Sequence, residues 1–137
     1  MKNTFIVTLL MLSLTLLSNS CKRGAGQGGS SEIKGRIYQY NVNLNFTSKL
    51  DSGWAQKQDV YLIYGDDVTF SDDQKTNFDG SYNFKYLRKG KYKVFTYSDD
   101  SSQAVPFRSK AVVRELEITK NKQTVELDSI VVWNKTN

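Results

Sequence analysis

Alternating apolar and polar residues recur in short stretches from Glu32 to Trp133, and this pattern restricts the chain to a β-rich fold. No window in this range places apolar residues at helical spacing between two capping signals. Tyr, Val, Ile, Phe and Thr, which favour strands, are frequent. We therefore expect an all-β domain with strands at residues 32–46, 58–64, 68–77, 81–86, 91–98, 111–118 and 123–133.

The strongest local signal is the Asp79-Gly80 pair, which lies between two strand-like runs. Both residues of such a pair can adopt positive φ, and this suits a tight β-hairpin turn. Tyr82, Phe84 and Tyr86 follow at alternate positions, so they are expected to share one face of the next strand. We predict that the third and fourth expected strands form a hairpin.

Several short motifs follow one another in a fixed order along the chain. They are Ile33-Lys34-Gly35-Arg36-Ile37, Val60-Tyr61-Leu62, Thr76, Asp79-Gly80-Ser81-Tyr82-Asn83-Phe84, Leu87, Gly90, Lys91-Tyr92-Lys93-Val94 and residues 125–132. This order resembles the carboxypeptidase regulatory-like, or transthyretin-like, group of β-sandwiches. The resemblance implies a seven-stranded antiparallel Greek-key sandwich. Its motifs are structural, so it carries no activity with it.

The chain departs from that pattern by a long insertion, residues 38–59, between the first two expected strands. Tyr38 and Tyr40 begin an apolar alternation whose parity is opposite to that of Ile33 and Ile37. A strand cannot bury both sets on one face without a slip of one residue. We therefore expect a bulge or a sheet crossing near Ile37 to Gln39, followed by a polar loop from Thr47 to Gln58.

The first 20 residues have the cationic start, apolar centre and small polar end of a secretory leader. The apolar centre is too short to span a bilayer. Cys21, the only cysteine, closes the leader, which favours a lipoprotein signal whose thiol carries acyl chains such as palmitate. Secretion after ordinary signal-peptidase cleavage is the alternative. We expect residues 21–31 to be a flexible Gly/Ser tether, 32–133 the sandwich and 134–137 a tail.

Lys22 follows Cys21, where the familiar inner-membrane retention signal has an aspartate. We therefore expect attachment to the outer membrane of a Gram-negative cell envelope, on its periplasmic or its surface face. Basic residues are dispersed among acidic ones, which indicates a solvated surface and no nucleic-acid groove. The expected partners are the membrane, through the lipid anchor, and a protein or a glycan.

The chain contains no histidine, which removes Ser-His-Asp and Cys-His catalysis and imidazole metal ligands. Acidic pairs could supply oxygen ligands to calcium. They are Asp66-Asp67, Asp72-Asp73 and Asp99-Asp100, and their spacing matches no calcium loop, which favours solvated turns. We expect no enzyme, cofactor or metal; a carboxylate-dependent hydrolase is the remaining catalytic alternative.

The candidate binding surface is an aromatic patch on two strands. The resemblance implies that these strands are neighbours and that four side chains point inward: Val60, Leu62, Tyr92 and Val94. Alternation then sends another four outward: Tyr61, Ile63, Phe95 and Tyr97. Trp54 could edge this patch, or the insertion could cover it with Leu44 and Phe46. An exposed patch of this kind favours a non-catalytic protein-binding or accessory role, with glycan binding as the alternative.

Asp128-Ser129-Ile130 resembles the Asp-Ser/Thr-aliphatic motif that is O-glycosylated in some Gram-negative envelope proteins. Ser129 is therefore a candidate O-glycosylation site.

Overall fold

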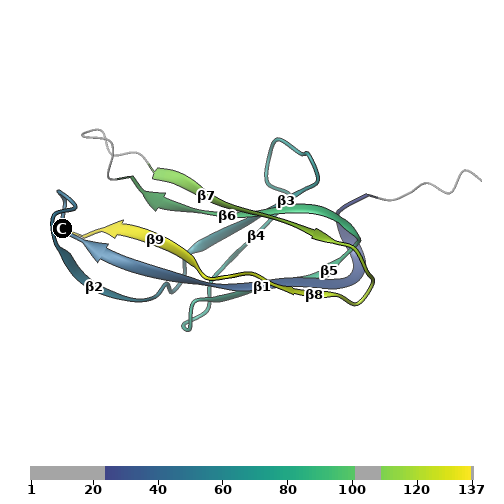
Figure 1. Cartoon of the computed structure of the whole chain (residues 1–137), viewed down its shortest axis with the longest axis horizontal. Helices are drawn as coiled ribbons and strands as arrows, with labels where there is room; N and C mark the ends of the chain where they lie inside the picture. Colours follow the sequence, from purple (N-terminus) through teal and green to yellow (C-terminus); the bar gives the residue numbers. More distant parts are fainter. Residues whose placement is uncertain (1–23, 101–108, 137) are drawn as a thin grey trace, which may run out of the picture.

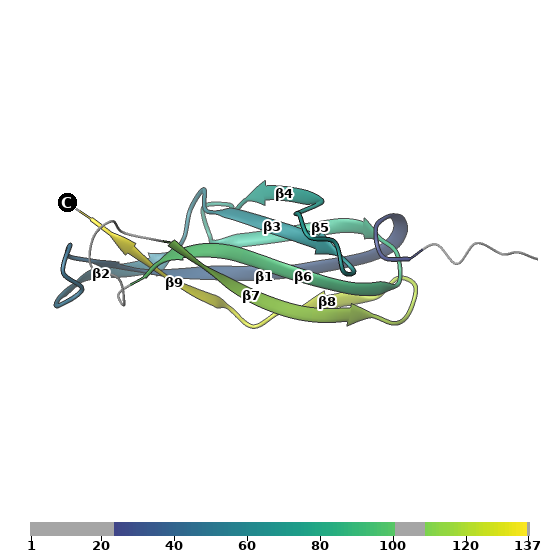
Figure 2. The ribbon, with the colours of Figure 1, turned by 90° about the horizontal axis from the view of Figure 1, so that it is seen from above.

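The computed structural model describes residues 24–100 and 109–136, and these fold into two β-sheets that pack face to face (Figures 1 and 2). The strands are β1 (Gln27–Val42), β2 (Lys49–Trp54), β3 (Asp59–Tyr64), β4 (Asp72–Lys75), β5 (Ser81–Leu87), β6 (Gly90–Asp99), β7 (Ser109–Ile118), β8 (Thr124–Glu126) and β9 (Ile130–Lys135). The all-β prediction is confirmed for this part of the chain, and it contains no helix that could cross a membrane.

β1 runs the length of the five-stranded sheet, and four other strands pair with it. Its first half lies between β5, which is antiparallel, and β8, which is parallel. Its second half lies between antiparallel β2 and parallel β9. The other sheet has the order β4-β3-β6-β7 and is antiparallel throughout. The sandwich is therefore assembled on one central strand.

The five-stranded sheet differs from the expected antiparallel sandwich of seven strands. The last expected strand is divided by residues 127–129 into β8 and β9, and both pair parallel with β1. The insertion contributes β2 where a polar loop was expected. The physical reason is that β1 continues to Val42, and its backbone groups beyond Ile37 need hydrogen-bond partners, which β2 and β9 supply.

The Asp79-Gly80 turn is present, but it does not close a hairpin. Gly80 has a φ of 73°, and its amide donates a hydrogen bond to the Asn77 carbonyl at 3.0 Å. β4, before the turn, pairs with β3, whereas β5, after it, pairs with β1. The predicted hairpin is therefore wrong, because this local signal specifies a chain reversal and not the sheet that each flanking strand joins.

The core contains the side chains expected to point inward from β3 and β6. Val60, Leu62, Tyr92 and Val94 are each at most 1% exposed, and β3 and β6 are neighbours, as predicted. The five-stranded sheet contributes Ile33, Ile37, Tyr82, Phe84, Leu87, Ile130 and Val132. Tyr86, expected on the same face as Tyr82, is instead 70% exposed, because its φ of 61° breaks the alternation.

The bulge or sheet crossing expected near Ile37 to Gln39 is replaced by a change of partners within one sheet, from β5 and β8 to β2 and β9. The pairing of β1 with β9 runs without interruption from Ile37 to Val42. Tyr38 and Tyr40 stay on the outer face of the sheet, so their parity requires no slip. The expectation was wrong because it assigned this second apolar row to the core.

Gly24 to Ser31, expected to belong to the flexible tether, are part of the fold. The Arg88 guanidinium donates hydrogen bonds to the carbonyls of Gly24 at 2.9 Å, Ala25 at 3.4 Å and Gln27. The buried Tyr92 hydroxyl accepts a hydrogen bond from the Gly26 amide at 2.9 Å. The tether expectation is therefore wrong from residue 24 onward. The leader, Cys21 and residues 22–23 lie outside the described residues.

Replacing Arg88 with alanine is expected to free the start of β1 and lower the free energy of unfolding by about 1.5–3 kcal/mol, as for hydrogen bonds to a charged group. Urea unfolding measures this loss. Lys89→Ala is the matched control, because Lys89 is exposed and its substitution should change stability by about 0.5 kcal/mol or less. Equal stabilities for the two variants would contradict the assignment.

Tyr82→Phe is expected to leave stability at pH 7 unchanged or higher, because the Tyr82 hydroxyl is buried without a hydrogen-bond partner in the described chain. Burial raises the pKa of this hydroxyl to about 12. The folded protein then holds a proton that the unfolded chain loses near pH 10, so stability falls between pH 10 and 12 by roughly 2–3 kcal/mol. Urea titrations across this range should show a shallower fall for Tyr82→Phe; parallel curves would rule the assignment out.

Candidate functional site

Each outer face of the sandwich carries a cluster of aromatic side chains. On the five-stranded sheet the cluster consists of Tyr38, Tyr40, Trp54, Val131 and Trp133, and we call it the tryptophan face. On the four-stranded sheet it consists of Tyr61, Phe70, Phe95, Tyr97 and Val113, and we call it the phenylalanine face. The two clusters differ in packing and in their polar surroundings.

The tryptophan face is a row of four rings across β2, β1 and β9. Strand register places Tyr38 opposite Trp54 and Tyr40 opposite Trp133. The centroids of Tyr38 and Trp54 are 5.3 Å apart, those of Tyr38 and Tyr40 are 5.4 Å apart, and those of Tyr40 and Trp133 are 5.0 Å apart. Trp54 is 40% exposed and Trp133 is 37% exposed. Both tryptophans of the chain are therefore open to solvent.

Two cationic side chains lie over rings of this row. The Arg36 guanidinium is 5.0 Å from the centroid of the Trp54 ring, and the Lys49 ammonium is 3.6 Å from that of Tyr40. Such contacts are weakly attractive at exposed sites. Arg36 also pairs with Asp79 at 3.1 Å. Hydrogen bonds from Ser81, together with this guanidinium, hold the pKa of Asp79 below its ordinary value.

A polar hollow of about 500 Å³ continues the tryptophan face beyond Arg36. Its lining includes Lys34, Arg36, Ser81, Asn83, Lys85 and Glu126. The Asn83 side-chain amide donates a hydrogen bond to Glu32 at 3.0 Å, while its oxygen has no partner within the described ranges. Hydrogen bonds from Asn83 and Thr124 lower the pKa of Glu32. The hollow therefore offers charged and neutral hydrogen-bonding groups beside the ring row.

The phenylalanine face is more tightly packed. The Tyr61 and Phe95 rings stack with centroids 4.9 Å apart and planes at 19°, and Phe70 packs against Tyr61 at 4.9 Å. Phe95 is only 9% exposed, whereas Phe70 and Tyr97 at the margins are 49% and 46% exposed. Burial raises the pKa of Tyr61. The central ring faces thus contact one another, and the cluster presents mainly its margins to solvent.

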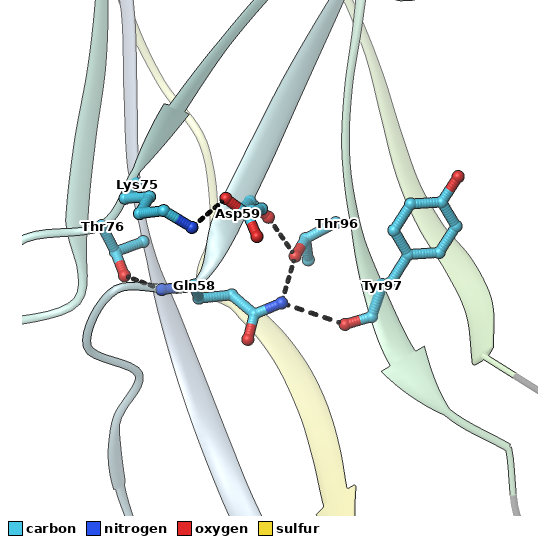
Figure 3. A network of polar contacts seen from close by, with 6 residues as sticks. All are labelled: Gln58, Asp59, Lys75, Thr76, Thr96 and Tyr97. Atoms are coloured by element: carbon cyan, nitrogen blue, oxygen red, sulfur yellow. Dashed lines mark hydrogen bonds and ion pairs between the residues drawn. The ribbon is translucent and has the colours of Figure 1, made fainter.

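The polar groups beside the phenylalanine face form a network that joins β3, β4 and β6 (Figure 3). The Gln58 amide donates to the Thr96 hydroxyl at 2.9 Å and to the Tyr97 carbonyl at 3.2 Å. Thr96 donates to the Asp59 carbonyl at 2.7 Å, and Lys75 pairs with the Asp59 carboxylate at 2.5 Å. Every member bonds to another strand or to the turn before β3, so the network holds the sheet together.

The structure brings together only part of the predicted patch. Tyr61, Phe95 and Tyr97 lie in one cluster. Ile63, two residues after Tyr61 on β3, is half-buried. Trp54 lies on the other sheet, so it does not edge this patch. The insertion extends the five-stranded sheet and leaves the patch uncovered, with Leu44 46% exposed.

Sequence reasoning missed four aromatic residues of the two faces: Tyr38, Tyr40, Phe70 and Trp133. The alternation of Tyr38 with Tyr40 was the available signal for the first two. Phe70 lies in the β3–β4 loop and Trp133 near the end of β9, where no local pattern indicated a shared surface.

The acidic pairs serve strand ends and loops. Asp67 accepts a hydrogen bond from Ser71, Asp72 accepts one from Gln27, and Asp99 accepts one from the Lys135 backbone amide. Among the described residues, no three acidic or thiol side chains gather to hold a metal ion. Ser129 is exposed in the connection between β8 and β9, not within a strand, and it lines the polar hollow.

Comparison with known proteins gives no family assignment for this chain. No family model matches the chain, and no curated protein matches it. A similar solved structure, from Pseudomonas aeruginosa, is named a "putative carbohydrate binding protein". It is 12% identical with a TM-score of 0.47, over 80% of this chain and 92% of that one. At this distance its ligand is not carried over, and the transthyretin-like resemblance stays a prediction.

Iodide is expected to quench the tryptophan fluorescence of the folded protein more strongly than caesium, because Arg36 and Lys49 attract anions to the exposed rings. Changing both residues to glutamine should lower the iodide quenching constant about twofold. The same change at Lys75 and Lys93, on the other sheet, is the control and should have no effect. Emission that neither ion quenches until the protein unfolds would contradict the exposure of the ring row.

Proposed function

We propose that the chain is a non-catalytic saccharide-binding module, attached by lipid to the cell envelope, whose binding surface is the tryptophan face. The observation that carries this proposal is the row of four rings, in which both tryptophans are exposed and both tyrosines half-buried, lying directly beside a polar hollow. The rings would stack on the apolar faces of sugar residues. The hollow would supply the hydrogen bonds that sugar hydroxyls require.

The shape of the surface favours an extended saccharide over a single enclosed sugar. The four rings lie across three strands, and the hollow adjoins the Trp54 end of the row, along β1 and β5 past Arg36 toward Lys34 and Asn83. Arg36 takes part in both regions, because it lies over the Trp54 ring and also lines the hollow. One ligand could therefore contact rings and polar groups along successive sugar units.

The envelope part of the proposal is supported by the sequence. The leader ends at the single cysteine, Cys21, and Lys22 follows it, which favours acylation and outer-membrane attachment. The lack of histidine supports a binding role over a catalytic one. O-glycosylation of Ser129 and membership of the transthyretin-like group remain proposals of the same kind, each supported by its sequence motif.

The phenylalanine face supports a second candidate function, docking of another protein. Phe70, Tyr97 and Val113 are each more than 40% exposed around the stacked centre. Such a surface suits an apolar protein contact.

Trp54→Ala and Trp133→Ala are each expected to weaken saccharide binding about tenfold or more, which corresponds to about 1.4 kcal/mol or more. Isothermal titration with hexasaccharides of glucose, mannose, xylose and N-acetylglucosamine, after an array screen, measures the change. Phe70→Ala and Tyr97→Ala are the matched controls on the opposite face and should bind normally.

Saccharide binding that survives both tryptophan substitutions would overturn the proposal. A panel without any saccharide ligand, together with a protein partner lost on Phe70→Ala, would replace it with the protein-docking function. Thermal unfolding of each variant distinguishes lost binding from lost folding.

A further inference from the structure

The end of the sandwich at which the chain enters lies close to the proposed lipid attachment point. Gly24, whose carbonyl is held by Arg88, is three residues from Cys21. Extended chain spans at most about 3.6 Å per residue, so at most roughly 11 Å of chain separates Cys21 from the folded domain. Any membrane that holds the acyl chains must therefore lie near this end. This inference rests on the lipid anchor of the proposed function.

Three exposed lysines from two turns surround this entry point. Lys89 lies in the β5–β6 turn, and Lys120 and Lys122 lie in the β7–β8 turn. The β7–β8 turn is fixed against β1: the Ser31 hydroxyl donates to the Lys120 carbonyl at 3.1 Å, and the Lys122 amide donates to the Ser30 hydroxyl at 3.1 Å. The backbone that carries Lys120 and Lys122 is therefore held in place beside the entry point.

No carboxylate in the described ranges forms an ion pair with these lysines. A hollow of about 510 Å³ between the turns is lined by Gly28, Gly29, Ser30, Arg88, Lys89 and Asn121. On the four-stranded side of this end, Lys91 shares a second hollow with Asp66 and Glu117, which offset its charge. At this end of the sandwich, the lysines that neither pair with a carboxylate nor share a hollow with one thus lie beside the entry point.

We propose that this end is a docking surface for an anionic phospholipid bilayer and that it holds the domain upright on the membrane. Each lysine near an anionic membrane surface raises the affinity roughly fivefold. In about 0.1 M salt this attraction is screened beyond about 10 Å. The lysines and the short link to Cys21 then act together. The hollow between the two turns, beside Arg88 and Lys89, accommodates a phosphate-bearing headgroup.

The upright orientation determines where the tryptophan face lies. Gln27 and Ser31 both pair with Leu87, so the regular part of β1 begins at Ser31. Tyr40 is nine residues beyond Ser31, a rise of roughly 30 Å at about 3.3 Å per residue. Figure 1 shows β2 and the end of β9 at the opposite end of the molecule from the β7–β8 turn. β1 therefore acts as a rigid spacer that presents the ring row away from the bilayer.

The docking surface is tested with the mature chain carrying Cys21→Ser, at low ionic strength, on vesicles of phosphatidylglycerol or of phosphatidylcholine. Co-sedimentation should show binding to phosphatidylglycerol alone. Combining Lys89→Gln, Lys120→Gln and Lys122→Asn should weaken it about a hundredfold. The matched control combines Lys57→Asn, Lys75→Gln and Lys110→Gln, which removes the same charge elsewhere; like Lys122, Lys57 has positive φ. Equal weakening by both sets, or no binding to phosphatidylglycerol, would overturn the proposal.

The orientation is tested by coupling the mature chain through its single thiol to a maleimide-headgroup lipid in vesicles that contain phosphatidylglycerol and brominated lipid. Trp54 and Trp133 should keep their fluorescence, because they stand away from the bromine atoms. Strong quenching would show that the tryptophan face lies on the bilayer, which contradicts the upright orientation. Because the thiol is coupled chemically, retained or quenched fluorescence does not depend on acylation in cells. Mass spectrometry of the membrane fraction tests that acylation separately.

Discussion

The pairing of one 16-residue strand, β1, with four others is the constraint on which the structure depends. Ile33, Gly35 and Ile37 are the alternate buried residues of β1, and they fix the register of β5 and β8 over the core. Because β1 continues past Ile37, it aligns β2 and β9, which carry Trp54 and Trp133. The same strand thus holds the core at one end and positions the ring row at the other.

The two aromatic faces show that ring content alone does not define a binding site. On the phenylalanine face, Tyr61 and Phe95 stack on each other, so their surfaces mainly stabilise β3 against β6. On the tryptophan face, the largest rings lie on the two strands flanking β1, and a polar hollow adjoins them. Hydrogen-bonding groups beside accessible rings, and not ring exposure alone, favour a ligand surface over packing that happens to be external.

Much of the fold could be predicted from the sequence, because strand alternation is a local property. The transthyretin-like resemblance implied the inward positions of Val60 and Val94 and the pairing of β3 with β6, and these are confirmed. The site could not be predicted, because it depends on which strands become neighbours. The parity of Tyr38 indicated a conflict in the core, whereas the structure resolves it by leaving the ring outside. Arg88 contacts Gly24 across 64 residues, and no local pattern could show that contact.

Saccharide binding by the tryptophan face is tested most directly at its two tryptophans. The chain has two tryptophans, so a ¹⁵N–¹H correlation spectrum contains two indole N–H signals, one from Trp54 and one from Trp133. Titration with the hexasaccharide that binds most tightly should shift both signals along one saturable curve, because both rings belong to one row. A ligand that binds the protein while leaving both indole signals unmoved would contradict binding by this face.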